Sequence, residues 1–90
     1  MPNSRYRVNL TPAAQRALRR LDRPIRSRVL GALTALGADP HPHGAKTLQG
    51  GDGLLRVRVG DYRVVYSVHE DQLLVLVVVL GHRSVVYRKL

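Results

Sequence analysis

Three arginines in the middle of the chain lie at a spacing that could hold a phosphate group. Arg56 and Arg58 precede the dipeptide Gly60-Asp61, which is typical of a two-residue hairpin turn, and Arg63 follows it. This turn predicts that Arg58 and Arg63 lie opposite each other and that all three arginines share one face. Like charges that face each other across a sheet are destabilising, and an anion between them would offset this cost. Phosphate suits arginine, which binds it through paired hydrogen bonds; the alternative is that the three side chains splay into solvent.

The same turn predicts the remaining pairs of the hairpin. The expected pairs are Val59 with Tyr62, Val57 with Val64, and Arg56 with Val65. The face away from the arginines is then apolar, and it should pack against helices. Its side chains are those of Leu55, Val57, Val64 and Tyr66.

The C-terminal segment carries three more side chains that could act on a nucleotide. His82, Arg83 and Tyr87 follow the last apolar run of the chain. Imidazole titrates near neutral pH and could accept a proton, and an aromatic ring can stack on an unpaired base. The alternative for Tyr87 is a structural role, in which its ring anchors the tail to the core.

The charge of the chain favours a polyanionic partner. Fifteen basic residues, thirteen of them Arg, stand against six acidic ones, and the formal net charge is +9. Residues 1–38 contain eight Arg and one Asp, so most of the excess lies there. A GC-rich genome would explain the choice of Arg over Lys, but it would not explain the shortage of acidic residues. We expect a polyanion-docking surface on basic residues outside the arginine hairpin, namely Arg16, Arg19, Arg20, Arg23 and Lys46.

The periodicity of the sequence predicts how these side chains are positioned. Residues 5–10 alternate between polar and apolar, as in a short strand. Thr11-Pro12 and Asp22-Arg23-Pro24 are typical helix starts, and the apolar spacing after each predicts two helices joined by a tight turn. Residues 39–53 contain four Gly and two Pro and are expected to form a loop.

From residue 54 the apolar period changes to two, which predicts three strands in an antiparallel meander. Their expected bounds are Leu54–Val59, Tyr62–His69 and Leu73–Leu80. The third is apolar on both faces, so it is either central and covered twice or partnered by another protein. The fold class is therefore α+β: one sheet with a helical hairpin on one face, in a single domain over residues 1–90. The partner of the first strand is left open.

Several classes of site are excluded or disfavoured. The chain has no Cys, which rules out disulfides and thiolate chemistry. His41 and His43 form a His-x-His pair, but no third ligand stands near them, so no metal site is expected. No apolar run is long enough to span a bilayer, and no signal segment precedes the first strand, so a cytoplasmic protein is expected.

Three segments together resemble a known superfamily. Gly60–Tyr66 (GDYRVVY), Gly81–Arg83 (GHR) and Val86–Arg88 (VYR) are similar to segments of the RelE/ParE superfamily, the toxins of bacterial type II toxin–antitoxin modules. The resemblance covers nearly the whole chain, including the helical hairpin, and the tail resembles the RelE branch more than the ParE branch.

The resemblance implies an activity and a set of partners. RelE-like toxins are ribonucleases that enter the ribosome and cut translated mRNA without a metal or other cofactor. The ribose 2′-hydroxyl attacks the adjacent phosphate and leaves a 2′,3′-cyclic phosphate. An acidic RelB-like antitoxin in a hetero-oligomeric complex would neutralise the toxin, and the polyanion-docking residues would bind RNA on the ribosome.

The resemblance also assigns site residues. They are Arg56, Arg58, Arg63, Arg83 and Tyr87. In the best-studied branch the first two are lysines, one of which is proposed as the general base. Arginine is a poor proton acceptor, so His82 is the substitute base expected here, with His69 a weaker candidate.

Two other readings of the sequence stay open. One is a ParE-like inhibitor of DNA gyrase, which binds its target and needs no nuclease site. The other is a toxin that has lost catalysis and survives as an antitoxin-binding module. Arg83 and Tyr87 favour the nuclease, whereas the two missing lysines favour the alternatives.

Overall fold

The computed structural model describes residues 5–50 and 53–90. Its helices and strands follow one another as β1, α1, α2, β2, β3, β4, η1, β5 and η2, where η marks a 3₁₀ helix. Their bounds are Arg7–Leu10 (β1), Pro12–Arg20 (α1), Arg23–Ala38 (α2), Lys46–Thr47 (β2), Leu55–Val59 (β3), Tyr62–His69 (β4), Glu70–Gln72 (η1), Leu74–His82 (β5) and Val86–Lys89 (η2).

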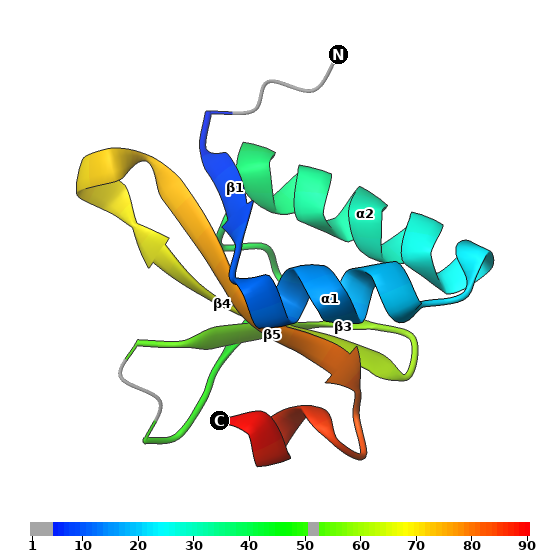
Figure 1. Cartoon of the computed structure of the whole chain (residues 1–90). Coiled ribbons are helices and arrows are strands. Elements are labelled where there is room, and N and C mark those ends of the chain that lie inside the picture. The colour runs from blue at the N-terminus through cyan, green and yellow to red at the C-terminus, as the bar shows by residue number, and fades with distance from the viewer. Residues whose placement is uncertain (1–4, 51–52) are drawn as a thin grey trace.

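The strands form one five-stranded sheet in the order β1-β5-β4-β3-β2. β1 pairs with β5 in parallel, and the other neighbours are antiparallel. α1 and α2 lie side by side on one face of the sheet, and the C-terminal η2 lies on the other (Figure 1). The expected α+β class, helical hairpin and meander are confirmed.

One feature of the sheet differs from expectation, and one that the sequence left open is now resolved. Within the segment expected to be a loop, Lys46 and Thr47 form β2 and pair with Arg56 and Leu55 of β3. Two residues are too few to show an alternating pattern in a Gly- and Pro-rich segment, so periodicity missed this strand. The second feature is the partner of β1, which pairs with the last strand because the helical hairpin carries the chain across the sheet.

Thr11 fixes the start of α1 against the sheet. Its Oγ1 accepts a hydrogen bond from the backbone N–H of Ala14 (3.2 Å), so it caps the helix as the sequence predicts. The same hydroxyl donates to the carbonyl of Val78 in β5 (2.7 Å). Pro12 occupies the first turn, where its missing N–H costs no hydrogen bond.

The carbonyl that Thr11 reaches belongs to a β-bulge. Val65 pairs with Val79 and Tyr66 pairs with Val77, so Val78 is an extra residue in β5. A bulge reverses the alternation of faces along the bulged strand. Residues of β5 beyond Val78 therefore lie on the faces opposite to those that a simple period of two predicts.

Apolar clusters cover both faces of β5. Val75, Val77 and Leu80 are buried in the cluster beneath the helices, together with residues of α2. On the other face Val79 packs with Val65 and with Val86 of η2. β5 is thus the central strand covered on both faces, the first of the two options that its apolar sequence left open.

Candidate functional site

The β3–β4 hairpin has the register that its turn predicts. Arg58 lies opposite Arg63, and the pairs on either side of them are also as expected. Gly60 adopts a positive φ of 59° in the turn, a conformation that other L residues rarely adopt. A Cβ at this position would lie 3.3 Å from the guanidinium of Arg28, an exposed side chain that can move aside, so the positive φ and not crowding favours glycine here.

β2 adds a fourth cation to the same face of the sheet. Lys46 lies directly opposite Arg56 in the β2–β3 ladder, so both side chains leave the sheet on one side. Arg56 and Arg58 are two residues apart in β3 and share that side, as does Arg63 opposite Arg58. We call Lys46, Arg56, Arg58 and Arg63 the basic face.

The basic face lies on the side of the sheet away from α1 and α2. Val57 and Val59 alternate with the arginines of β3 and are buried in the cluster beneath the helices. Leu48 and Leu54 lie two residues from Lys46 and Arg56 and pack with Val86 of η2 instead. The four cations therefore flank the apolar cluster that η2 covers.

Arg63 is the buried member of the basic face, with an exposed fraction of 8 %. Its Nη1 donates hydrogen bonds to the carbonyls of Gly60 and Tyr62, both at 3.0 Å. These bonds hold one end of the guanidinium against the turn. A guanidinium has five N–H donors, and those on Nε and Nη2 are not engaged in these two bonds. Arg63 is thus held in place while keeping donors available for an anion.

Arg83 is joined to the tip of the same hairpin. Its backbone N–H donates to the carbonyl of Asp61 (2.8 Å), and its Nε lies 3.8 Å from the Asp61 carboxylate. Both side chains are largely exposed, so the ion pair contributes little stability. The backbone bond brings Arg83 to the hairpin turn that also anchors Arg63.

Tyr87 lies on η2 and is 43 % exposed. The preceding residue, Val86, is fully buried and fixes η2 to the sheet. Val86 therefore anchors η2 to the sheet, which leaves both the stacking role and the structural role of Tyr87 as alternatives. The Tyr87 ring is left accessible to a partner on the same side of the sheet as the basic face.

His82 is not brought together with the basic face. His82 of β5 pairs with Tyr62 of β4, and Tyr62 pairs in turn with Val59 of β3. Val59 is buried beneath the helices, so His82 also lies on the helix side of the sheet. Its ring makes an edge contact with that of Tyr62, with centroids 5.5 Å apart. The Val78 bulge causes this placement, because without the extra residue His82 would project to the other side.

The hydrogen bonds of His82 also restrict its chemistry. Its Nδ1 accepts from the backbone N–H of Ser84 (3.1 Å) and lies 2.8 Å from the Ser84 hydroxyl. A backbone N–H can only donate, so in the neutral ring the proton lies on Nε2. The lone pair that a general base needs is therefore already engaged.

The remaining candidates lie away from the basic face. Arg16, Arg19, Arg20 and Arg23 are exposed residues of the helical hairpin, on the opposite side of the sheet. His69, the weaker candidate for the base, lies at the far end of β4, where Ser67 Oγ is 2.9 Å from its Nε2. The structure thus separates two basic surfaces, one on the helices and one on the sheet.

A polar cluster that the sequence did not indicate joins three distant segments. Tyr6 donates a hydrogen bond to the Glu70 carboxylate, and His41 Nε2 lies 3.2 Å from the other Glu70 oxygen. The bond from Tyr6, and then that from His41, holds the pKa of Glu70 below its usual value. The bond to Glu70 raises the pKa of Tyr6. Only tertiary structure brings these residues together, so no local pattern could have found them.

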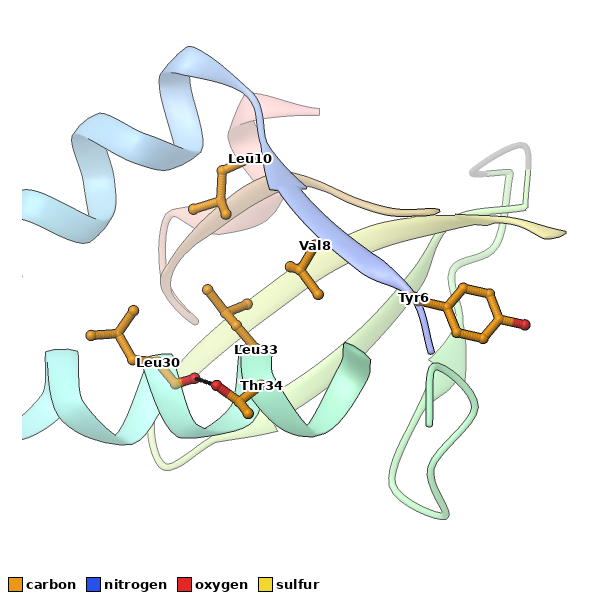
Figure 2. Close-up of a pocket in the computed structure, with 6 residues that line it drawn as sticks. All are labelled: Tyr6, Val8, Leu10, Leu30, Leu33 and Thr34. Carbon is orange, nitrogen blue, oxygen red and sulfur yellow. Dashed lines mark hydrogen bonds between the residues drawn. The ribbon is translucent and has the colours of Figure 1, made fainter. Parts of the chain in front are cut away.

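An apolar groove runs between the edge strand β1 and α2, with a volume of about 370 Å³ (Figure 2). Its lining residues are Tyr6, Val8, Leu10, Leu30, Leu33 and Thr34. Thr34 Oγ1 donates to the carbonyl of Leu30 (3.1 Å), so its hydroxyl is turned to its own helix. The groove offers burial for a partner and no catalytic group.

Residues 5–50 and 53–90 contain no group of three or more His, Cys, Asp or Glu side chains placed to hold a metal ion. Within the same ranges no helix is both long and apolar enough to cross a membrane.

Comparisons with known proteins agree on one family. Residues 8–87 match the family model described as "ParE toxin of type II toxin-antitoxin system, parDE". The RelE–RelB complex of the archaeon Pyrococcus horikoshii OT3 has a chain that is 31 % identical, with a TM-score of 0.77 over 88 % of this chain and 96 % of that one. No curated protein sequence matches the chain.

Two bacterial structures are also similar. A chain of the RelBE2 toxin–antitoxin complex of Mycobacterium tuberculosis is 28 % identical, with a TM-score of 0.77 over 87 % of this chain and 98 % of that one. The isolated RelE toxin of E. coli has a TM-score of 0.76 over 94 % and 99 % of the two chains. Its identity of 21 % supports a shared fold and no more.

Proposed function

Because the chain belongs to the RelE/ParE superfamily of type II toxin–antitoxin toxins, we propose that it is a ribosome-dependent mRNA endoribonuclease that inhibits translation. The observation that carries the proposal is the basic face, where three arginines and a lysine gather on one side of the sheet. Such a set of like charges is costly in a free protein and favourable around a phosphate.

The proposed reaction uses the RNA's own 2′-hydroxyl as the nucleophile. Its oxygen attacks the neighbouring phosphorus, the bond to the 5′-oxygen breaks, and the products are a 2′,3′-cyclic phosphate and a 5′-hydroxyl. The pentavalent transition state carries more negative charge than the starting phosphodiester. Cations fixed before the reaction lower this barrier, and no external nucleophile is needed.

The geometry suggests a role for each side chain. Arg63, held by two carbonyls, and Arg83, held at the turn, would bind the scissile phosphate, while Arg56 and Arg58 would contact neighbouring charge. The exposed ring of Tyr87 would stack on a splayed base and hold the 2′-oxygen in line with the leaving group. His82 is a weaker candidate for the base than its sequence position suggested, because it lies on the helix side.

The proposed partners follow from charge and shape. A ribosome-directed toxin would act in the cytoplasm, and the exposed arginines of α1 and α2 would dock on ribosomal RNA. An acidic RelB-like antitoxin would neutralise the toxin in a hetero-oligomeric complex. In support, the relatives from P. horikoshii and M. tuberculosis were both crystallised in toxin–antitoxin complexes. The apolar groove between β1 and α2 would provide burial beside the charge complementarity.

The second candidate is inhibition of DNA gyrase, and the matched ParE family model is the observation that favours it. One experiment separates the two. Purified protein is added to programmed ribosomes, and 5′ ends of the mRNA are mapped; in parallel, it is added to a gyrase supercoiling assay. Cuts in ribosome-bound mRNA support the nuclease. Inhibited supercoiling with intact mRNA supports the gyrase inhibitor, and two negative results support a module without catalysis.

A further inference from the structure

The short strand β2 places one lysine among the arginines of the basic face. Lys46 lies opposite Arg56, and directly opposed residues in a sheet have Cβ atoms about 4.5–5.5 Å apart. Arg56 in turn shares its side of the sheet with Arg58, which lies opposite Arg63. Lys46 is exposed at the edge of the sheet, so its side chain can reach a ligand bound over the basic face.

Lysine differs from its three neighbours in what it can do with a proton. Arginine stays protonated at all accessible pH values, so it can stabilise charge but cannot transfer a proton. A lysine ammonium can stabilise charge and can also release a proton. Among the four side chains of the basic face, only that of Lys46 can therefore act as a general acid.

The proposed cleavage needs such an acid at one atom. When the bond from phosphorus to the 5′-oxygen breaks, the oxygen leaves as a strongly basic alkoxide unless it is protonated during the step. A positioned acid typically accelerates a step of this kind by about 10²–10⁴-fold. His82 projects from the helix side of the sheet, so we do not assign this proton to it.

We propose that Lys46 is the general acid of the cleavage reaction and protonates the 5′-oxygen leaving group. This inference rests on the proposed function. The 2′-oxygen forms its bond to phosphorus, the electron pair of the breaking bond takes a proton from Nζ of Lys46, and the 2′-hydroxyl proton passes to water. The neutral amine then regains a proton from water, so the protein is unchanged after each turnover.

The test compares two leaving groups in Lys46→Arg, which keeps the positive charge but cannot release a proton. Ribosome-bound mRNA is prepared with either the natural oxygen or a sulfur at the bridging 5′ position of the scissile bond. A thiolate leaves without protonation. We expect Lys46→Arg to cut the oxygen substrate about 10²–10⁴-fold more slowly than the unaltered protein, and the sulfur substrate at a nearly unaltered rate.

Arg58→Ala is the matched control, because it removes a charge from the same face and should slow both substrates alike. Lys46→Met should behave like Lys46→Arg on the oxygen substrate, with an additional loss from the missing charge on both. Circular dichroism and thermal unfolding of the exposed-edge variants establish that they fold.

Three outcomes would overturn the inference. An unchanged rate of Lys46→Arg on the oxygen substrate excludes proton donation by Lys46. Equal slowing on both substrates means that Lys46 positions the RNA and is not the acid. If the unaltered protein cuts neither substrate, the proposed nuclease function is wrong and the inference about Lys46 fails with it. The first two outcomes, by contrast, contradict only the inference about Lys46.

Discussion

Arg58 and Arg63 face each other across the β3–β4 ladder, yet Arg63 is buried and Arg58 is exposed. Arg63 turns back to the carbonyls of Gly60 and Tyr62, whose partial negative charge offsets part of its own. Local hydrogen bonds therefore reduce the repulsion of this pair without removing it, and the hairpin is left with a buried, hydrogen-bonded cation beside an exposed one.

The remaining repulsion between Arg58 and Arg63 leads to the first prediction. Arg58→Glu replaces a like-charge pair with an opposite-charge pair, so the free energy of unfolding should rise by about 0.2–1 kcal/mol. The same change puts a negative charge where the RNA phosphate is proposed to bind, so toxicity and mRNA cleavage should be lost. Thermal unfolding and growth after induced expression measure the two effects. Reduced stability with retained toxicity would refute a phosphate site at this pair.

The second prediction concerns Arg83, whose backbone N–H forms the hydrogen bond that joins it to the hairpin. Arg83→Ala keeps the bond from the residue 83 N–H to the Asp61 carbonyl and removes only the guanidinium. The single-turnover cleavage rate should fall by about 10²–10³-fold, while the affinity for ribosomes changes little. Filter binding and rapid-quench measurements separate these quantities.

Arg7→Ala is the matched control for Arg83→Ala. Arg7 is exposed on β1, which forms one edge of the sheet, while β2 forms the other edge. This variant should cleave at the unaltered rate. If the two variants lose activity equally, then net charge governs cleavage and Arg83 has no specific role.

The sequence predicted the hairpin well because a two-residue turn fixes register by itself. Gly60-Asp61 aligned every pair from Val59–Tyr62 to Arg56–Val65, and the structure confirms all of them. Other features depend on contacts that no local pattern encodes. β2 consists of two residues that pair with β3, and β1 finds its partner through a crossover.

The bulge at Val78 had the largest consequence for the site. A period of two that continues from Val77 places His82 on the side of the arginines, and the extra residue reverses this. Nothing in a run of consecutive valines and leucines marks which residue will bulge. The bulge is held by Thr11, whose hydroxyl accepts the helix N–H and donates to the Val78 carbonyl.

The third prediction concerns Tyr66 and the stability of the folded protein at alkaline pH. Burial raises the pKa of Tyr66 to about 12, against about 10 in an unfolded chain. The folded protein keeps this proton where the unfolded chain loses it, so stability is full below pH 10 and falls as pH rises toward 12. The loss should amount to about 2–3 kcal/mol, measured by chemical unfolding across this range.

Tyr66→Phe tests the assignment. The variant removes the bond from the Tyr66 hydroxyl to the Pro40 carbonyl (2.8 Å), which costs about 1 kcal/mol at neutral pH. Its stability should then depend much less on pH between 10 and 12. Tyr87→Phe changes an exposed ring and should keep the full dependence; equal behaviour of the two variants would contradict the prediction.

The helical hairpin makes a fourth prediction, on association with ribosomes. Arg19 and Arg20 are exposed in the last turn of α1. If each contacts a phosphate, replacing both with Gln should reduce the slope of log affinity against log salt by about 1.5. The cleavage rate of bound mRNA should be unaffected, because these residues lie across the sheet from the basic face.

The matched control for that pair is Arg5→Gln with Arg7→Gln, which lowers the net charge by the same two units at the start of β1. A smaller change in slope is expected there. Equal slopes for the two double variants would mean that total charge drives association. An affinity that does not change with salt would exclude a polyanion-docking role for the helices altogether.

The fifth prediction concerns His82, for which the sequence pattern and the structure predict opposite effects of the substitution His82→Gln on the cleavage rate. As a general base, His82 would have to accept the 2′-hydroxyl proton, and His82→Gln would lower the single-turnover rate about 10²–10⁴-fold and remove its dependence on pH near neutrality. In the structure its Nδ1 is engaged by the Ser84 N–H and its ring lies on the helix side. We therefore expect His82→Gln to cleave at nearly the unaltered rate with an unaltered pH profile.

Ser84→Pro, which removes the N–H that His82 accepts, distinguishes the two readings further. If His82 is structural, this variant lowers thermal stability and leaves the chemical step alone. If His82 is the base, a freed Nδ1 changes the pH profile while His82→Gln abolishes it. A lower single-turnover rate of His82→Gln on ribosome-bound mRNA, together with a lost pH dependence, would contradict this prediction and assign the general base to His82.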